Sequence, residues 1–179
     1  MQIVWDFGVG IKEYVENFSS IVFPLLLECP VCGAGIPLER HGFYPRNALP
    51  RAVEYRISIV RYLCKSCCHT VSLLPSFLLP RFQHTREVIL ESLRALFSRR
   101  RLLLYRQIAY HYKKRFQRNV LAIVSALRDA GCRERLPDDE NERAIKLVDR
   151  LSTLTLPDSP VGNGQFSIRI LTNFMALSL

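Results

Sequence analysis

The sequence has little that would carry it into or across a membrane. It has no early cluster of basic residues, and Asp6 stands near the N-terminus, which argues against a secretory signal. The apolar runs at 21–27 and 166–179 are too short or too interrupted to cross a bilayer. No internal repeat or low-complexity tract is present either. We therefore expect a cytoplasmic protein with no membrane partner, whose 49% hydrophobic residues suffice for a packed core.

Cysteine is present in an informative pattern. The pairs Cys29/Cys32 and Cys64/Cys67 are both C-x2-C units, and 31 residues separate them. Two residues between cysteines let one tight turn aim both sulfurs at a metal, and two such turns complete a tetrahedron. The spacing therefore predicts one structural zinc ion, with a disulfide pair or four ordinary core cysteines as the alternatives. None of the four histidines forms an H-x-x-x-H pair, so no second metal is expected.

The two remaining cysteines are given no ligand role. Cys68 could compete with its neighbour Cys67, but only Cys67 keeps the two-residue spacing. Cys132 follows Gly131 far downstream and is interpreted as a free thiol near a helix end. Because no secretory signal is predicted, the cysteines indicate a reducing compartment, where C-x2-C pairs usually bind metal.

Strands are predicted between and after the two cysteine pairs. Residues 1–28 are expected to be a lead-in with a short helix at 11–18, packed as a lid. Residues 29–80 are expected to be a zinc ribbon of antiparallel strands at 36–44, 53–63 and 70–74. The middle strand alternates along its whole length, and the first is expected to stop at Pro45. Two prolines five residues apart, Pro75 and Pro80, make 75–82 a hinge. Its apolar residues must be buried and are expected to dock the ribbon onto the helices beyond.

Residues 81–135 are predicted to be helical. Thr85 is a plausible N-cap, and an apolar stripe at helical spacing follows it. A second helix is expected at about 102–112 and a third from Arg115 to Gly131. The intervening turn at 113–115 lacks the usual glycine, so a continuous helix through 102–130 is the alternative. The fold class is thus α+β, a zinc ribbon followed by a module resembling a helix-turn-helix.

Positive charge is concentrated in this helical segment. Residues 81–135 hold 14 basic and 4 acidic side chains, whereas the chain as a whole carries +9. Such a concentration suits a phosphate backbone, because each neutralised phosphate releases a counterion. The alternative is a solvated helical surface. The predicted DNA contacts are Arg99, Arg100, Arg101, Arg106, Lys113, Lys114, Arg115, Gln117, Arg118 and Asn119.

Residues 136–179 have a different composition. An acidic loop at 138–140 precedes a predicted helix at 142–154, and prolines and glycines make 157–164 a linker. The apolar end at 166–179 could be a strand, a docking segment or the start of a longer element. The carboxylates of this region are most simply a solvated loop and helix surface.

Several motifs together carry a resemblance to a known family. They are Trp5-Asp6-Phe7-Gly8, Cys29-Pro30-x-Cys32-Gly33, Arg40-His41-Gly42-Phe43-Tyr44-x-Arg46, Arg61-Tyr62-x-Cys64-x-Ser66-Cys67 and the run from Thr70 to Pro80. Over about residues 1–135 the chain resembles a bacterial family of unknown function associated with transposases. That family is similar to the zinc-binding N-terminal modules of insertion-sequence transposases, which precede helix-turn-helix segments. The resemblance implies zinc at the four cysteines and duplex DNA, of mobile-element or promoter type, as the partner.

Catalysis is not expected. A complete transposase needs a catalytic domain with three metal-binding carboxylates, and the 44 residues after Arg135 are too few for one. The predicted function is therefore binding to DNA, with association with the nucleoid. One rival is a protein-interaction module that forms a homo-oligomer or joins a transposase or RNA polymerase. The other is a metal-dependent nuclease or a hydrolase, although four cysteines leave zinc no open position for water.

Overall fold

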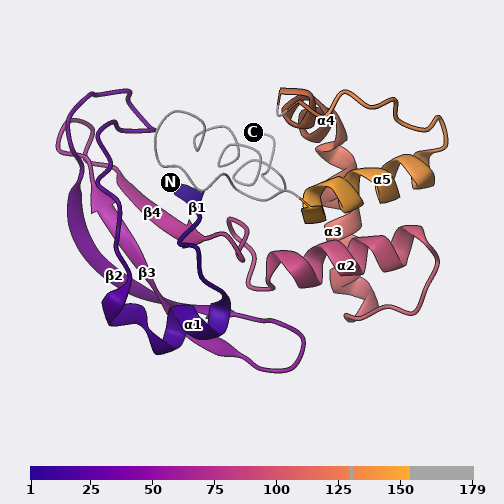
Figure 1. Ribbon diagram of the computed structural model, residues 1–179, viewed down its shortest axis with the longest axis horizontal. Helices are drawn as coiled ribbons and strands as arrows, with labels where there is room; N and C mark the ends of the chain where they lie inside the picture. The colour runs from indigo at the N-terminus through magenta and orange to yellow at the C-terminus, as the bar shows by residue number, and fades with distance from the viewer. Residues whose placement is uncertain (130, 154–179) are drawn as a thin grey trace.

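The computed structural model describes residues 1–129 and 131–153, which divide into a sheet and a group of helices (Figure 1). The sheet and its covering contain β1 (Gln2–Trp5), α1 (Ile11–Glu16), the short 3-10 helix η1 (Phe18–Ser20), β2 (Glu39–Ala48), β3 (Tyr55–Leu63) and β4 (Thr70–Pro75). The helices after the sheet are α2 (Arg86–Phe97), α3 (Arg106–Arg118), α4 (Val120–Asp129) and α5 (Glu140–Thr153). Figure 1 shows the two parts side by side along the longest axis of the molecule.

The sheet has the order β1-β4-β3-β2, and β1 was not predicted. β1 runs parallel to β4 and places Gln2 opposite Ser72, while the other neighbours are antiparallel. The N-terminal ammonium group also donates to the carbonyl oxygen of Thr70, at 2.7 Å. The interpretation of residues 1–28 as a lead-in is therefore wrong at its start. Four residues are too short for a visible period, and the partner that stabilises them lies about 70 residues away.

β2 continues past the point where it was expected to stop. It runs to Ala48, and Pro45 lies opposite Ser58 of β3. β2 is an edge strand in the described sheet, and an edge tolerates proline where its nitrogen faces away from the partner strand. A bulge between Arg40 and Phe43 interrupts the register, and Gly42 there has a φ of +88°.

The predicted strand at 53–63 is confirmed as β3, and both of its faces are buried. Ile57 and Ile59 belong to one face, Val60 and Tyr62 to the other. The first face joins the sheet cluster, which consists of Tyr14, Ala48, Ile57, Ile59, Leu74 and Leu78. The second joins the knuckle cluster, which consists of Cys29, Leu38, Val60, Tyr62, Cys64, Val71 and Leu73. The sheet therefore separates the core of the sheet part into two clusters, one on each face.

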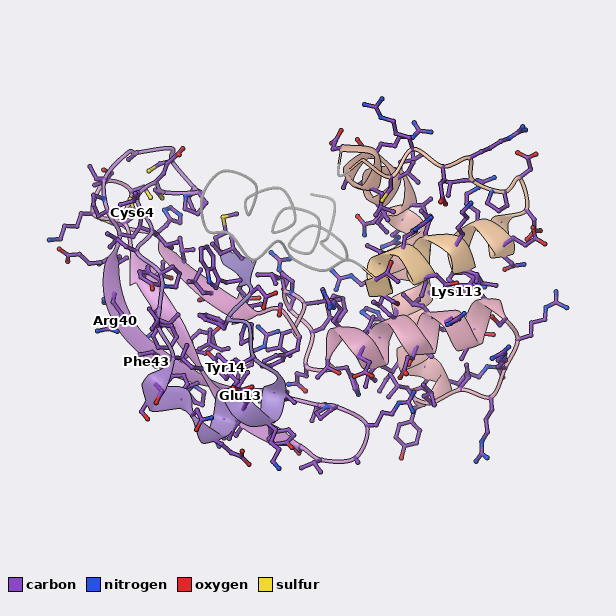
Figure 2. The ribbon with its side chains drawn as sticks, viewed as in Figure 1. Glu13, Tyr14, Arg40, Phe43, Cys64 and Lys113 are labelled. Carbon is purple, nitrogen blue, oxygen red and sulfur yellow. The ribbon has the colours of Figure 1, made fainter. Side chains whose placement is uncertain are left out.

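The predicted lid is present as α1 and η1. Figure 2 labels Tyr14 on α1, where the helix lies across the sheet. Its hydroxyl donates to the carbonyl oxygen of Ser58 at 3.0 Å, and its ring is fully buried against Phe7, Phe18 and Phe77. These contacts fix α1 on β3.

The hinge at 75–82 docks the sheet part onto the helices, as predicted. Leu78 and Leu79 are both fully buried, but Leu78 belongs to the sheet cluster and Leu79 to the helical cluster. The helical cluster consists of Val4, Leu79, Phe82, Ile89, Leu90, Leu93, Phe97, Tyr112, Phe116, Ile123, Leu127, Ala144, Leu147, Val148 and Leu151. Val4 of β1 is a member, so the unpredicted strand also contacts the helical part.

The hinge is held by side chains from two strands. Arg46 of β2 donates through Nη2 to the carbonyl oxygens of Leu79 and Phe82, at 3.1 and 2.6 Å. Gln2 of β1 accepts the backbone N–H of Arg81 at 3.0 Å. Two segments of the sheet part thus satisfy hinge groups that no regular element would satisfy.

The helix boundaries differ from those predicted. α2 begins after Thr85 as expected, although the Thr85 hydroxyl makes no capping hydrogen bond. The second helix begins at Arg106 rather than at about 102 and runs through 113–115. The turn predicted at 113–115 is therefore wrong, because Lys-Lys-Arg consists of good helix formers. α3 and α4 meet instead at Asn119, whose side chain donates to the carbonyl oxygen of Arg115 at 2.8 Å. The described residues do not show a helix-turn-helix.

The helix predicted at 142–154 is confirmed as α5, which begins two residues earlier. Asp139 accepts the backbone N–H of Glu142 at 2.8 Å, so the acidic loop caps the helix. The predicted linker at 157–164 and the apolar end at 166–179 lie outside the described residues. None of the helices in the described ranges is long and apolar enough to span a bilayer.

Candidate functional site

The first cysteine pair lies in a tight turn before β2. The backbone N–H of Gly33 donates to the carbonyl oxygen of Cys29 at 2.8 Å, and the N–H of Cys29 donates to that of Ala34 at 2.9 Å. Gly33 has a φ of +70°, the left-handed region that glycine adopts without strain. The turn thereby brings both cysteines of the pair to one side.

The second pair forms a turn of the same design after β3. The N–H of Cys68 donates to the carbonyl oxygen of Cys64 at 2.9 Å, and the N–H of Cys64 donates to that of His69 at 3.0 Å. Cys68 occupies the position of Gly33 and has a φ of +56°. Its place is thus set by the turn, and its side chain is exposed. Of the two neighbours, the structure places Cys67 and not Cys68 in the group of four sulfurs that could hold a metal.

The two turns bring four sulfur atoms together. The sulfurs of Cys29, Cys32, Cys64 and Cys67 all lie within 4.8 Å of one another. The Cys29–Cys67 and Cys32–Cys64 sulfur pairs are 3.7 and 3.8 Å apart, and all six cysteines are free thiols. A disulfide bond of about 2.05 Å does not describe these pairs. The arrangement can hold one metal ion, and within 1–129 and 131–153 no other group of His, Cys, Asp or Glu side chains offers such a site.

The protonation of these thiols also suits a cation. Burial raises the pKa of Cys29, but hydrogen bonds from the backbone of Cys32 and Val31 and from the thiols of Cys64 and Cys32 together lower it to about 6. The backbone of His69 lowers the pKa of Cys67, yet burial and the neighbouring thiols raise it to about 12. The Cys29 thiol thus loses its proton readily, whereas the Cys67 thiol resists losing its proton beside the other thiols. A bound cation removes that resistance, since ligating thiols are deprotonated.

The site rests on the knuckle cluster, and Cys29 and Cys64 are themselves fully buried members of it. Tyr62 supports the same region, because its hydroxyl donates to the carbonyl oxygen of Pro24 at 2.7 Å. Figure 2 shows Cys64, beside other yellow sulfur atoms, at the end of the molecule away from the helices, with Lys113 in the opposite half. The sulfur group therefore lies in the sheet part, which contacts the helical part through the hinge and also through Val4 of β1.

Replacing Cys68 by glycine is expected to raise the free energy of unfolding by about 0.5–1 kcal/mol, because a side chain in the left-handed region is strained. Urea unfolding of the metal-loaded protein measures the gain. Metal content must stay unchanged, since loss of metal in Cys68→Gly would make Cys68 a ligand after all. The matched variant Gly33→Ala places the same strain in the first turn and should lower stability by a similar amount.

Comparison with known proteins concerns the segment that carries this site. Residues 29–102 match the family described as Domain of unknown function (DUF6431). The DUF6431 match contains both cysteine pairs, β2, β3 and β4, the hinge and α2, and it ends before α3. The comparison with curated proteins gave no match, and the comparison with solved structures gave none either. The matched segment therefore contains both the sulfur group and α2, the first helix of the helical part.

The predicted DNA contacts divide into two places. Arg99, Arg100 and Arg101 lie in the connection from α2 to α3, and all three are exposed. Arg99 has a φ of +53°, and the N–H of Arg100 returns to the carbonyl oxygen of Ala95 at 2.8 Å. These residues thus terminate α2 as well as carrying charge.

The other predicted contacts lie on or beside α3. Arg106, Lys114, Gln117 and Arg118 are exposed, although Gln117 donates to Glu140 at 2.9 Å. Lys113 and Arg115 lie on the flanks of the helix, over the rings of Phe97 and Phe82 at 5.2 and 4.8 Å. Asn119 is 9% exposed, and its amide is directed to the Arg115 carbonyl, so we do not retain it as a base contact.

Three further residues close to these predicted contacts were not predicted from the sequence. Gln107 and His111 are exposed on α3 between the predicted residues, and Arg81 of the hinge lies close to Arg115. Once α3 is known to begin at Arg106, its 3.6-residue period places Gln107 and His111 on the same exposed face as the predicted contacts. No local signal places Arg81 beside the helix, because the hinge conformation brings it there.

Proposed function

We propose that this chain binds duplex DNA through α3 and that one structural zinc ion holds its sheet part in shape. Four thiolates around one ion are the donor set of structural zinc sites. A tetrahedron with Zn–S distances of about 2.3 Å has its sulfurs about 3.8 Å apart. The 3.7 and 3.8 Å pairs fit that geometry. The four cysteines would fill the coordination shell, so the ion supplies structure rather than chemistry.

The single observation that carries DNA binding is the solvent face of α3. The helix contains no Asp or Glu, and Ala109, Tyr112 and Phe116 form its buried side. The opposite side consists of Arg106, Gln107, Tyr110, His111, Lys114, Gln117 and Arg118. A helix of this kind fits the major groove, where cations contact phosphates and amides reach base edges. Gln107 is free to do so, whereas Gln117 must first leave Glu140.

Binding to mobile-element DNA is the more specific form of this proposal. It is supported by the resemblance of the ribbon motifs to the zinc-binding modules of insertion-sequence transposases. In this form the chain acts in the cytoplasm, on the nucleoid, and contributes binding without catalysis.

The proposal is tested by the salt dependence of binding to a duplex. Fluorescence anisotropy with a labelled duplex should give log K falling linearly with log salt concentration. The triple variant Arg106→Gln, Lys114→Gln and Arg118→Gln should bind roughly 10–100-fold more weakly. The slope should fall by about one for each phosphate contact removed.

A matched variant removes three charges from the sheet part instead. Lys12, Arg40 and Arg56 are all exposed on elements of that part, and their replacement by glutamine should leave both affinity and slope unchanged. Equal weakening by the two variants would show that net charge alone attracts DNA. Absence of any affinity at low salt would reject the proposed function.

A protein-interaction role is the second candidate, and a different observation favours it. Exposed apolar side chains gather in sequence around the first cysteine pair: Val22, Leu25, Leu27, Val31 and Ile36, of which Val22 is 87% exposed. Such residues can contact a partner protein or a second copy of this chain. Light scattering that finds a monomer at every concentration would remove the homo-oligomer form of this candidate.

A further inference from the structure

Arginines from two segments meet around Phe82, where the hinge joins α3. The guanidinium carbon of Arg115 lies 4.8 Å from the centre of the Phe82 ring, and Arg81 immediately precedes that ring in the chain. On α3, His111, Arg115 and Arg118 stand at i, i+4 and i+7, so they share one flank of the helix. The His111 ring is 6.5 Å from the Phe82 ring. We call Arg81, His111, Arg115 and Arg118 the hinge cations.

No carboxylate neutralises the three arginines within the part of the chain that the structure describes. The six ion pairs found there involve other cations, such as Arg51 with Glu91 and Arg94 with Asp149. Burial lowers the pKa of Arg115, and the charges of Arg81 and Arg118 lower it further. Arg81 and Arg118 are thus close enough to Arg115 to repel its charge, and no ion pair among the described residues offsets this repulsion.

Arg115 also has donors that the chain leaves unsatisfied. Its Nε and Nη2 atoms are shielded from solvent and have no hydrogen-bond partner among the described residues. An unsatisfied buried donor costs about 1–3 kcal/mol, and more when the group is charged. An incoming acceptor that drew the guanidinium off Phe82 would recover that cost.

Arg81 is held in place at a further cost. Its φ of +69° lies in the left-handed region, where glycine would be free of strain. Its N–H donates to Gln2, and Arg46 fixes the carbonyl groups on either side of it, those of Leu79 and Phe82. Contacts from two strands therefore hold the strained backbone of Arg81 at a place where its charge acts on Arg115. Strain of this kind is concentrated at functional positions.

We propose that the hinge cations form a clamp for one phosphate group of the DNA backbone. The inference rests on the proposed function, which it deepens by joining Arg81 of the hinge and Arg115 to His111 and Arg118 of the exposed face of α3. Arginine forks pair with two phosphate oxygens at once, and His111 adds a further ring nitrogen. Because Arg81 belongs to the hinge, the clamp anchors the sheet part and α3 to the same strand of DNA. A free phosphate or a nucleotide offers the same chemistry, and the test separates these sources.

The test uses the full chain with Arg81→Gln and Arg115→Gln, which leaves Arg106, Lys114 and Arg118 in place. Affinity for a labelled duplex should fall roughly tenfold, and the salt slope should decrease by about one, the loss of one anchored phosphate. Inorganic phosphate, compared with chloride at equal ionic strength, should raise the melting temperature of the wild type saturably and that of the variant not at all. Arg40→Gln with Arg56→Gln is the charge-matched control and should behave as the wild type.

The outcomes distinguish the clamp from the proposed function. If the wild type binds DNA and the variant keeps the same affinity and slope, the clamp is wrong and DNA binding stands. If the wild type binds no duplex but its phosphate effect is lost in the variant, DNA binding is wrong and the site serves a free phosphate. If neither DNA binding nor the phosphate effect changes, the clamp is overturned. Arg115→Lys, which keeps the charge without the fork, should restore only part of the affinity, and unchanged helical circular dichroism confirms that the helical part of each variant is folded.

Discussion

A chain in which Cys29 and Cys64 are replaced by serine will bind no metal and will lose the folded state of its sheet part. Structural zinc contributes an apparent binding free energy of about 10–16 kcal/mol in small zinc-binding peptides. A whole domain is stable by only about 5–15 kcal/mol, so the sheet part should not compensate for that loss. Cys29 and Cys64 are moreover fully buried in the knuckle cluster, and two turns depend on them.

The loss of folded structure in this variant should be confined at first to the sheet part. The helical cluster contains none of the four cysteines of the sulfur group, so helical circular dichroism should persist while near-ultraviolet signals from the sheet part disappear. Elemental analysis should give one zinc per wild-type chain and none in the variant. Cys132→Ser is the matched control, since Cys132 lies outside the sulfur group and should leave metal content unchanged. A variant that stays metal-free yet melts like the wild type would show that the ion is dispensable.

Replacing Arg46 by methionine will lower the free energy of unfolding by about 2–4 kcal/mol. The change removes two hydrogen bonds from a charged donor. The carbonyl oxygen of Phe82 loses its bond at 2.6 Å, whereas that of Leu79 keeps only the backbone N–H of Phe82 at 3.2 Å. Methionine keeps most of the aliphatic volume, so the loss reports the hydrogen bonds rather than a cavity. Burial already lowers the pKa of Arg46, which indicates how little solvent could replace those bonds.

Urea unfolding measures this effect, and Arg56→Met provides the comparison. Arg56 is an exposed arginine on β3 opposite β2, and its replacement should change stability by no more than about 0.5 kcal/mol. Equal losses in the two variants would indicate a general effect of charge removal. Because Arg46 also fixes the carbonyl groups around Arg81, its replacement should weaken phosphate protection as well.

The parts of the structure that local pattern determines were predicted. The two cysteine pairs define their own turns, and the alternation of 53–63 and the apolar stripe of α2 define a strand and a helix. The hinge was predicted from its prolines, because a segment that cannot be helical but is apolar must bury its side chains. In each case the residues close together in the sequence were sufficient to predict the structure.

The parts that depend on distant partners were not predicted. β1 acquires its hydrogen bonds from β4, and Arg81 reaches α3 only because of the hinge conformation. The break in the long helix was misplaced for a related reason. A turn was expected among Lys113, Lys114 and Arg115, which favour helix, whereas Asn119 ends α3 by bonding back to the preceding turn.

The irregular outer margin of β2 has a consequence for how copies of this chain can meet. A straight, unprotected sheet border invites another polypeptide to extend the sheet, which is a common route to aggregates and fibrils. Here the break in pairing at Gly42, a proline and three basic residues, Arg40, Arg46 and Arg51, in or just beyond the strand make that border a poor template. Any self-association of the described part should therefore proceed through side chains rather than through sheet extension.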